Sequence, residues 1–146
     1  MASKYLELAF PNLRGTAYEI TSPSSPRYNC VAWAAGETHR WWWPAPSYYW
    51  PKGVTREATL STFVAVFRSL GYAVCQDDRL EAGFEKIAIY VDAAGVPSHA
   101  ARQLESGEWT SKLGPDVDIR HVDLKSLESA IYGVVSQVLK RKKDAR

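Results

Sequence analysis

Cys30 is the residue whose type and surroundings are best suited to nucleophilic chemistry. It follows Asn29, a residue typical of helix N-caps, and precedes an apolar run over residues 31–35 that ends at Gly36. This pattern predicts a short helix that begins at Cys30. The free N–H groups and the positive end of such a helix stabilise a thiolate, so the pattern favours a lowered thiol pKa and a reactive cysteine.

A catalytic cysteine also needs a base within hydrogen-bond reach and a polar group that orients this base. His99 is the candidate base, because it opens the middle strand of an antiparallel meander predicted over residues 86–91, 98–104 and 109–114. Without such a base, the alternative is that Cys30 is a small buried hydrophobe, the commonest state of a free cysteine in an apolar run.

The candidate orienting groups are Asp116 and Asp118. If residues 105–108 form a simple hairpin loop, Leu104 faces Trp109, and counting outward places His99 opposite Gly114. The two carboxylates follow directly on that strand end. The sequence therefore predicts a carboxylate beside the imidazole, where an orienting group is required.

The aromatic segment over residues 40–51 contains six large aromatic residues and three prolines. The prolines exclude regular structure and the rings demand burial, so we predict a loop that packs over the domain like a lid. The alternative is that some rings line a cleft beside Cys30 and stack on a substrate. The candidate substrate-binding residues are Tyr28, Asn29, Trp33, Trp42 and Trp43.

The remaining elements follow from periodicity and turn signals. Residues 4–10 form a short helix or strand that ends at Pro11, and residues 18–20 form a weak strand. A helix follows a start signal at 55–58 and continues to Gly71, and a strand over 72–75 makes Cys75 a core residue without chemistry. From Leu124 to Leu139 the apolar spacing predicts a C-terminal helix, with a break at 132–133 followed by a strand as the alternative.

Composition places the chain among globular α+β proteins. With 146 residues and 46% hydrophobic content, we expect one domain over residues 1–139 and a solvated basic tail over 140–146. A net charge of +2 indicates no nucleic-acid partner. The chain lacks a signal-like N-terminus and any apolar stretch of the roughly 20 residues that span a membrane, which predicts a cytoplasmic protein, with specialised export left open.

Other polar residues offer weaker alternatives. Cys30, His99 and His121 match no metal-binding spacing, so we expect neither a metal nor a cofactor. Two cysteines make no disulfide framework, and both are expected to be reduced. Ser111 and Lys112 are expected on an exposed hairpin, with a cleft-facing position as the alternative. His39, next to Arg40 in a loop, is expected to be solvated. The oligomeric state is left open.

The order of these features resembles the papain-like cysteine hydrolases, most of all their compact NlpC/P60 and CHAP-type branch. The likeness covers roughly residues 28–120 in order only. It implies a cysteine-bearing helix packed on an antiparallel sheet, with Cys30 as nucleophile, His99 as base and Asp118 or Asp116 as the orienting residue. The backbone N–H of Cys30, with Tyr28 or Asn29, would then form the oxyanion hole.

This resemblance implies acyl transfer on a peptide or another amide-containing substrate. His99 would take the thiol proton, the thiolate would attack the carbonyl, and water or an amine would resolve the acyl-enzyme. Peptidase, amidase, deamidase and transferase activities share this machinery. Segments 29–34, 41–44, 99–103 and 109–114 also resemble an uncharacterised group of small bacterial domains, which implies no activity. The alternative is a non-catalytic binding module of papain-like fold whose tryptophan-rich loop holds a ligand such as a glycan.

Overall fold

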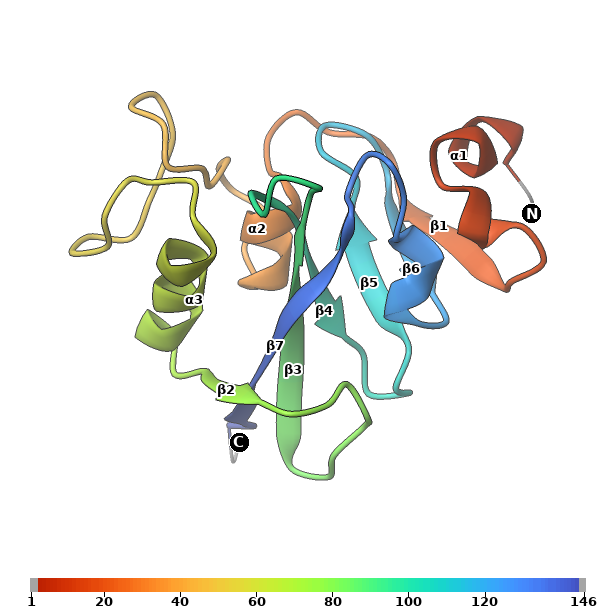
Figure 1. Cartoon of the computed structure of the whole chain (residues 1–146). Helices are drawn as coiled ribbons and strands as arrows, with labels where there is room; N and C mark the ends of the chain where they lie inside the picture. The colour runs from red at the N-terminus through yellow and green to blue at the C-terminus, as the bar shows by residue number, and fades with distance from the viewer. Residues whose placement is uncertain (1–2, 145–146) are drawn as a thin grey trace.

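A seven-stranded antiparallel sheet forms the centre of the protein (Figure 1). The computed structural model describes residues 3–144. The strands follow the spatial order β1-β6-β5-β4-β3-β7-β2, so the predicted meander of β3, β4 and β5 lies in the middle of the sheet. The strands are β1 (Tyr18–Ser22), β2 (Ala73–Cys75), β3 (Phe84–Val91), β4 (Pro97–Gln103), β5 (Trp109–Lys112), β6 (Asp118–His121) and β7 (Val134–Lys142).

One face of the sheet is covered by α2 (Cys30–Ala34) and α3 (Leu60–Ser69). Successive strand residues point to opposite faces, and this face presents Ile87, Ile89 and Ala100 to the two helices. We call it the α2 face. In Figure 1 both helices lie to the left of β5 and β6.

The opposite face, which we call the α1 face, is covered by short elements. These are α1 (Lys4–Ala9) and the 3₁₀ helices η1 (Pro11–Leu13) and η2 (Leu124–Leu127). They pack against Ala88 and Tyr90, so the two faces of the sheet carry separate hydrophobic cores. Among the described residues, no helix combines the length and apolar character needed to cross a membrane.

Local signals predicted the helix starts well. Asn29 caps α2, which begins at Cys30 as predicted. The helix predicted from the signal at 55–58 is α3, although its N-cap is Thr59, whose side chain accepts a hydrogen bond from the N–H of Thr62. Residues 4–9 are helical and residues 18–22 are a strand, as the sequence indicated.

The predicted C-terminal helix is wrong beyond its first turn. Only η2 forms there, and the chain then turns at Gly133 and continues as β7, which was the alternative interpretation. β7 pairs with β3 on one side and β2 on the other. Its apolar residues are mostly the β-branched Val134, Val135 and Val138, which favour strands. The spacing of the apolar residues alone fitted both a helix and a strand, and pairing with the neighbouring strands decided in favour of the strand.

The predicted register of the β4–β5 hairpin is wrong by one residue. Trp109 faces Gln103 rather than Leu104, and Thr110 faces Arg102. The connection has five residues, because the N–H of Leu104 donates to the carbonyl oxygen of Glu108. A one-residue shift changes which side chains lie on which face, so this difference bears on His99.

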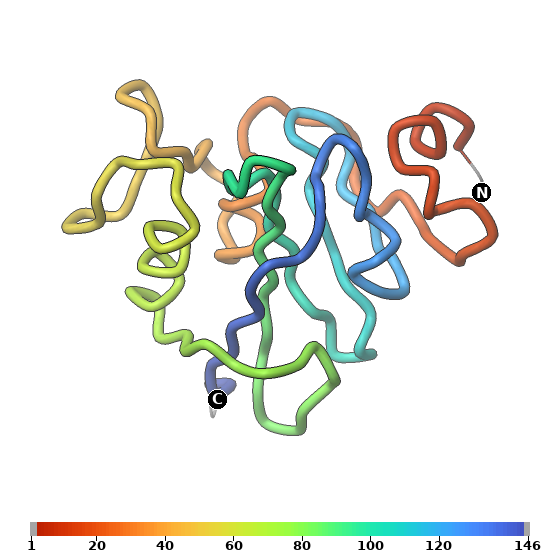
Figure 2. Tube along the Cα trace, in the orientation of Figure 1, coloured from red at the N-terminus to blue at the C-terminus, as the bar shows by residue number. Residues whose placement is uncertain are grey.

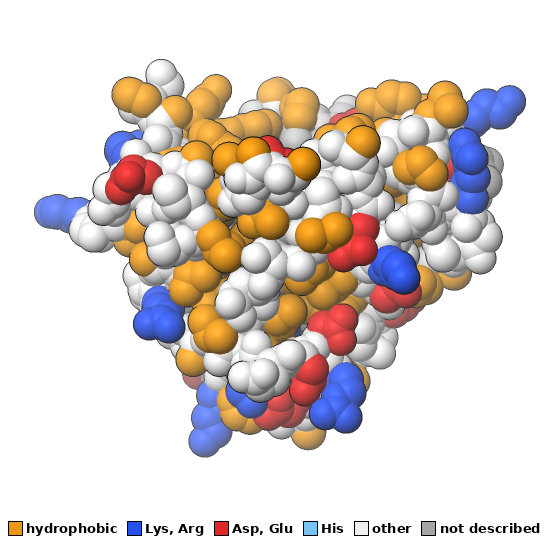
Figure 3. All heavy atoms as spheres, in the orientation of Figure 1, with side chains coloured by type: hydrophobic (Ala, Val, Ile, Leu, Met, Phe, Trp, Pro, Cys, Tyr) orange, Lys and Arg blue, Asp and Glu red, His pale blue; other side chains and the backbone are white. Residues whose placement is uncertain are grey.

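The basic C-terminal run is largely structured. Residues 140–142 belong to β7, where Lys140 and Arg141 pair with Glu81 and Glu85, each at 2.8 Å. In Figure 3 acidic and basic side chains gather together at the end of the face where β2 and β3 lie. Ala145 and Arg146 of the expected tail lie outside the described residues. Cys75 was predicted to be a core residue but is only half-buried, because β2 is an edge strand.

The aromatic segment connects α2 to α3 and lies beside the sheet (Figure 2). As predicted, it packs: Trp42 and Trp50 are each 4% exposed. The rings of Trp43 and Trp50 lie 5.3 and 5.2 Å from that of Phe63 in α3. The loop is therefore an extension of the core over α3.

Candidate functional site

Cys30 lies buried at the start of α2, against β4. Asn29 holds this helix start in place. Its Oδ1 accepts hydrogen bonds from the N–H groups of Ala32 (3.2 Å) and Trp42 (3.1 Å), and its Nδ2 donates to the carbonyl oxygen of Trp42 (2.8 Å). Asn29 therefore fastens the aromatic segment to the helix that carries the thiol.

The thiol of Cys30 is protonated at neutral pH, contrary to the prediction from its helix position. Burial raises its pKa to about 11. Hydrogen bonding by the backbone of Ala100, Val31 and Cys30 itself opposes this rise, as does the charge of Lys112. The groups that would stabilise a thiolate are thus in place, but desolvation outweighs them in this conformation.

A buried polar cluster lies next to Cys30. The Nζ of Lys112 donates to the carbonyl oxygens of Ser25 and Gly114 and lies 4.6 Å from the centre of the Tyr28 ring. Both Ser111 and Lys112 are fully buried, so the expected exposed hairpin is wrong. Burial lowers the pKa of Lys112, while nearby carboxylates and Cys30 raise it. Lys112 is the cation that acts electrostatically on the thiol.

Asp118 orients Tyr28 rather than a histidine. Its carboxylate accepts hydrogen bonds from the hydroxyls of Tyr28 (2.8 Å) and Thr21 (2.6 Å), and it is fully buried. Burial, followed by the hydrogen bond to Asp118, raises the pKa of Tyr28 to about 12. Because the Tyr28 hydroxyl donates its hydrogen bond to Asp118, it is not free to donate to an oxyanion.

His99 lies within the sheet and its ring faces away from α2. It pairs with Tyr90 of β3 on the α1 face, and its ring stacks on that of Tyr132 with centroids 4.1 Å apart and planes at 9°. It is fully buried, and neither ring nitrogen has a hydrogen-bond partner among the described residues. Burial and then the neighbouring His121 depress its pKa well below the usual value, so the ring is neutral.

The structure thus places the predicted nucleophile against the residue that follows the predicted base, but on the opposite face of the sheet from the ring of that base. The sulfur of Cys30 interacts with the backbone of Ala100, the residue after His99, but Ala100 belongs to the α2 core and His99 packs with Tyr90 on the other face. No hydrogen bond links His99 to a carboxylate in the described part of the chain. Asp116 instead accepts a hydrogen bond from the Tyr5 hydroxyl at 2.7 Å.

The predicted substrate-binding tryptophans are packing residues. Trp33 donates from Nε1 to the Oγ1 of Thr110 (3.0 Å), and the guanidinium of Arg102 lies 5.1 Å from its ring centre. Trp42 is in the α2 core. These contacts anchor α2 and the aromatic segment to the sheet.

A second histidine site was not recognised from the sequence. His121 Nε2 lies 2.8 Å from Ser111 Oγ, and Nδ1 lies 2.8 Å from the carbonyl oxygen of Asp123. Both side chains are fully buried, and no local signal links two residues that meet only through the pairing of β5 with β6. Over residues 3–144, no cluster of three or more histidine, cysteine or acidic residues is arranged to hold a metal.

The two buried histidines are expected to make the fold acid-sensitive. Burial lowers the pKa of His121 to about 4, and it also lowers the pKa of His99 well below its usual value of about 6.5. The unfolded chain therefore binds more protons, and the free energy of unfolding falls as pH drops below about 6.5, by up to about 2.7 kcal/mol per unit for the two groups. Urea unfolding between pH 7 and 5 measures this slope.

Cys30 is expected to resist alkylation near neutral pH. With a thiol pKa of about 11, its reaction with iodoacetamide should be slower than that of an ordinary thiol of pKa about 8.5 and should accelerate up to about pH 11. Cys75, which is more exposed, should be modified first. Peptide-resolved mass spectrometry measures both rates. A Cys30 rate that levels off below pH 8 would contradict the expected pKa.

Comparison with known proteins gives one match. The family described as Domain of unknown function (DUF7689) matches residues 19–140. This range includes the cysteine helix, the aromatic segment and all seven strands except the first residue of β1 and the end of β7. Neither a curated protein nor a solved structure matches the chain significantly.

Proposed function

The chain belongs to the DUF7689 family, and we propose that it is a cysteine-dependent acyl-transfer enzyme with Cys30 as nucleophile and His99 as base. The observation that carries the proposal is the unpartnered imidazole of His99. A buried ring with two unpaired nitrogens costs free energy, about 1–3 kcal/mol for each unpaired group, and a catalytic role is one reason for a fold to keep such a ring. This ring precedes the residue whose backbone interacts with the Cys30 sulfur.

The described arrangement represents the resting state of this enzyme. The thiol is protonated and the imidazole is neutral, which is the correct pair of protonation states for general-base catalysis. Because the two side chains lie on opposite faces of the sheet, proton transfer requires the start of β4 to rearrange so that the His99 ring turns toward Cys30. The pairing of β3 with β4 is already irregular there, between Tyr90 and Val91. The sulfur would then attack an amide or ester carbonyl, the C–N or C–O bond would break, and the amine or alcohol would leave with the proton held by the imidazole. Water or an amine would then release the acyl group from the sulfur.

Four groups favour negative charge on the Cys30 sulfur. The backbone of Cys30, Val31 and Ala100 already interacts favourably with negative charge on the sulfur, and Lys112 adds a positive charge nearby. Such preorganised donors stabilise a thiolate and a tetrahedral oxyanion without reorganisation. The resemblance to papain-like hydrolases adds to this support, with the difference that the carboxylate in the expected place serves Tyr28.

Acylation by p-nitrophenyl acetate tests the proposal. We expect acetylation of Cys30, detected by peptide-resolved mass spectrometry, and a decrease of about hundredfold in its rate in His99→Ala. Cys75→Ser, which removes the other thiol, should leave the rate unchanged. Iodoacetamide alkylation of Cys30, which needs only a thiolate, should change much less in His99→Ala. Equal acetylation of Cys30 with and without His99 would overturn the assignment of the base.

A further inference from the structure

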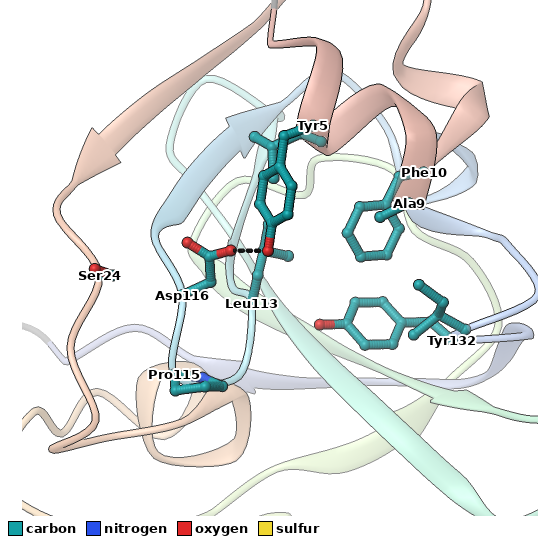
Figure 4. Close-up of a pocket in the computed structure, with 10 residues that line it drawn as sticks. Tyr5, Ala9, Phe10, Ser24, Leu113, Pro115, Asp116 and Tyr132 are labelled. Atoms are coloured by element: carbon teal, nitrogen blue, oxygen red, sulfur yellow. Dashed lines mark hydrogen bonds between the residues drawn. The ribbon is translucent and has the colours of Figure 1, made fainter.

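A cavity of about 360 Å³ opens on the α1 face, between α1, the turn after β5 and the segment before β7. Figure 4 shows its walls: Phe10 and Tyr132 on one side, Tyr5 and Asp116 on the other. Most of the lining is apolar, with Leu113 between the two sides. The volume is at the lower end for small-molecule pockets, about 300–1,000 Å³, which favours a compact ligand.

Asp116 places a negative charge in this apolar setting. One carboxylate oxygen accepts the hydroxyl proton of Tyr5 at 2.7 Å, and the other accepts the N–H of Val117 at 2.8 Å. A carboxylate offers about four acceptor sites, so each oxygen can accept one more donor. Among residues 3–144 no cation forms an ion pair with Asp116. The charge of Lys112 acts on Asp116 at longer range, and its Nζ donates to carbonyl oxygens instead.

The Tyr132 hydroxyl is the second polar group of the cavity. Its ring is held flat on His99, and the hydroxyl points across the cavity toward Leu113 in Figure 4. Within the described chain this hydroxyl has no hydrogen-bond partner. Burial raises the pKa of Tyr132, so the group is a neutral hydroxyl that can accept a hydrogen bond.

We propose that this cavity binds a primary amine with a compact apolar body. The ammonium group would donate to the free acceptor sites of Asp116 and to the Tyr132 hydroxyl, while the body would pack between Leu6, Phe10 and Leu113. An anion is disfavoured by the carboxylate, and a neutral apolar molecule would leave the free acceptor sites of Asp116 and the Tyr132 hydroxyl without a hydrogen-bond donor. Exposed apolar side chains at the rim, Tyr5 (66%) and Ile131 (54%), extend the same surface.

The inference goes beyond the proposed acyl transfer, because it concerns a separate cavity. Amine binding there can be measured without any acyl donor, so it can fail or succeed independently of the chemistry at Cys30. Isothermal titration calorimetry with phenethylamine should give saturable binding, at least about tenfold tighter than 2-phenylethanol or 3-phenylpropanoate, which share the ring and differ in charge. Titration with the dipeptide phenylalanyl-glycine tests the source of the ammonium group. Binding as tight as that of phenethylamine would favour the N-terminus of a peptide, and weaker binding would favour a free amine.

Variants locate the site. Asp116→Asn should weaken phenethylamine binding about tenfold, Tyr132→Phe should weaken it severalfold, and Ala9→Phe, which fills the cavity, should abolish it. Glu105→Gln removes a carboxylate that is 93% exposed on the β4–β5 connection and should have no effect. The proposal fails if 3-phenylpropanoate binds as tightly as the amines, if no amine binds, or if amine binding is the same in Asp116→Asn and Tyr132→Phe as in the wild type.

Discussion

Replacing Gly133 by alanine is expected to destabilise the protein by about 4 kcal/mol or more, a large part of the 5–15 kcal/mol that holds a typical domain together. Gly133 has φ +72°, and a Cβ at this position would overlap the carbonyl oxygen of Val91. A backbone oxygen in a central strand cannot move aside. The substitution therefore forces β7 away from β3, in addition to about 1 kcal/mol for the left-handed backbone.

Gly95 provides a matched control for this prediction. It has φ +80°, close to that of Gly133, but a Cβ there meets no atom within 4 Å. Gly95→Ala should therefore cost only the backbone term, about 1 kcal/mol. Urea unfolding of both variants, with comparison of midpoints at unchanged slope, separates the two contributions. An equal loss of unfolding free energy in the two variants would show that the overlap with Val91 does not destabilise Gly133→Ala.

His99→Phe is expected to stabilise the fold and to abolish acylation of Cys30. Phenylalanine keeps a ring on Tyr132 and removes two buried nitrogens that have no partner. Replacing unsatisfied polar atoms by apolar ones should raise the free energy of unfolding by about 1–3 kcal/mol at neutral pH. The same change removes the proposed base, so acetylation of Cys30 should fall by about hundredfold or more.

His121→Phe is the control with the opposite sign. Both nitrogens of His121 have partners, Ser111 and the carbonyl oxygen of Asp123, so the substitution leaves these groups unpaired and should destabilise by about 1–3 kcal/mol. His99→Phe should also reduce the slope of the free energy of unfolding against pH between pH 5 and 7, because one of the two buried histidines is removed. If His99→Phe is destabilising, the imidazole has a structural partner and the argument for its role in catalysis is lost.

Tyr132 contacts the residues on which these predictions depend. This residue precedes Gly133, packs on His99 and lines the cavity beside Asp116. The close approach of Gly133 to Val91 fixes the turn that carries Tyr132, and the Tyr132 ring in turn stacks on His99. The same turn links the fold to both proposed sites.

Several features were predictable because they depend on residues near one another in the chain. The start of α2 at Cys30 follows from the Asn29 cap, a contact that spans three residues. The strands of the meander follow from apolar runs and turn residues. Cys30 and His99 were recognised as a candidate pair from their places at a helix start and a strand start. An α+β fold with an antiparallel sheet follows from these elements.

Long-range pairing decided the rest. The five-residue β4–β5 connection shifted the register by one, and the pairing of β7 with β3 turned an expected helix into a strand. Burial of Cys30 in the core of the α2 face raised a thiol pKa that the helix start alone would lower, and Lys112 became a buried cation. Cap and turn signals in the sequence determined where elements begin, because those energies are local. Which face each side chain occupies, and how much water it keeps, depends on contacts between residues far apart in the chain, and only the tertiary structure decided them.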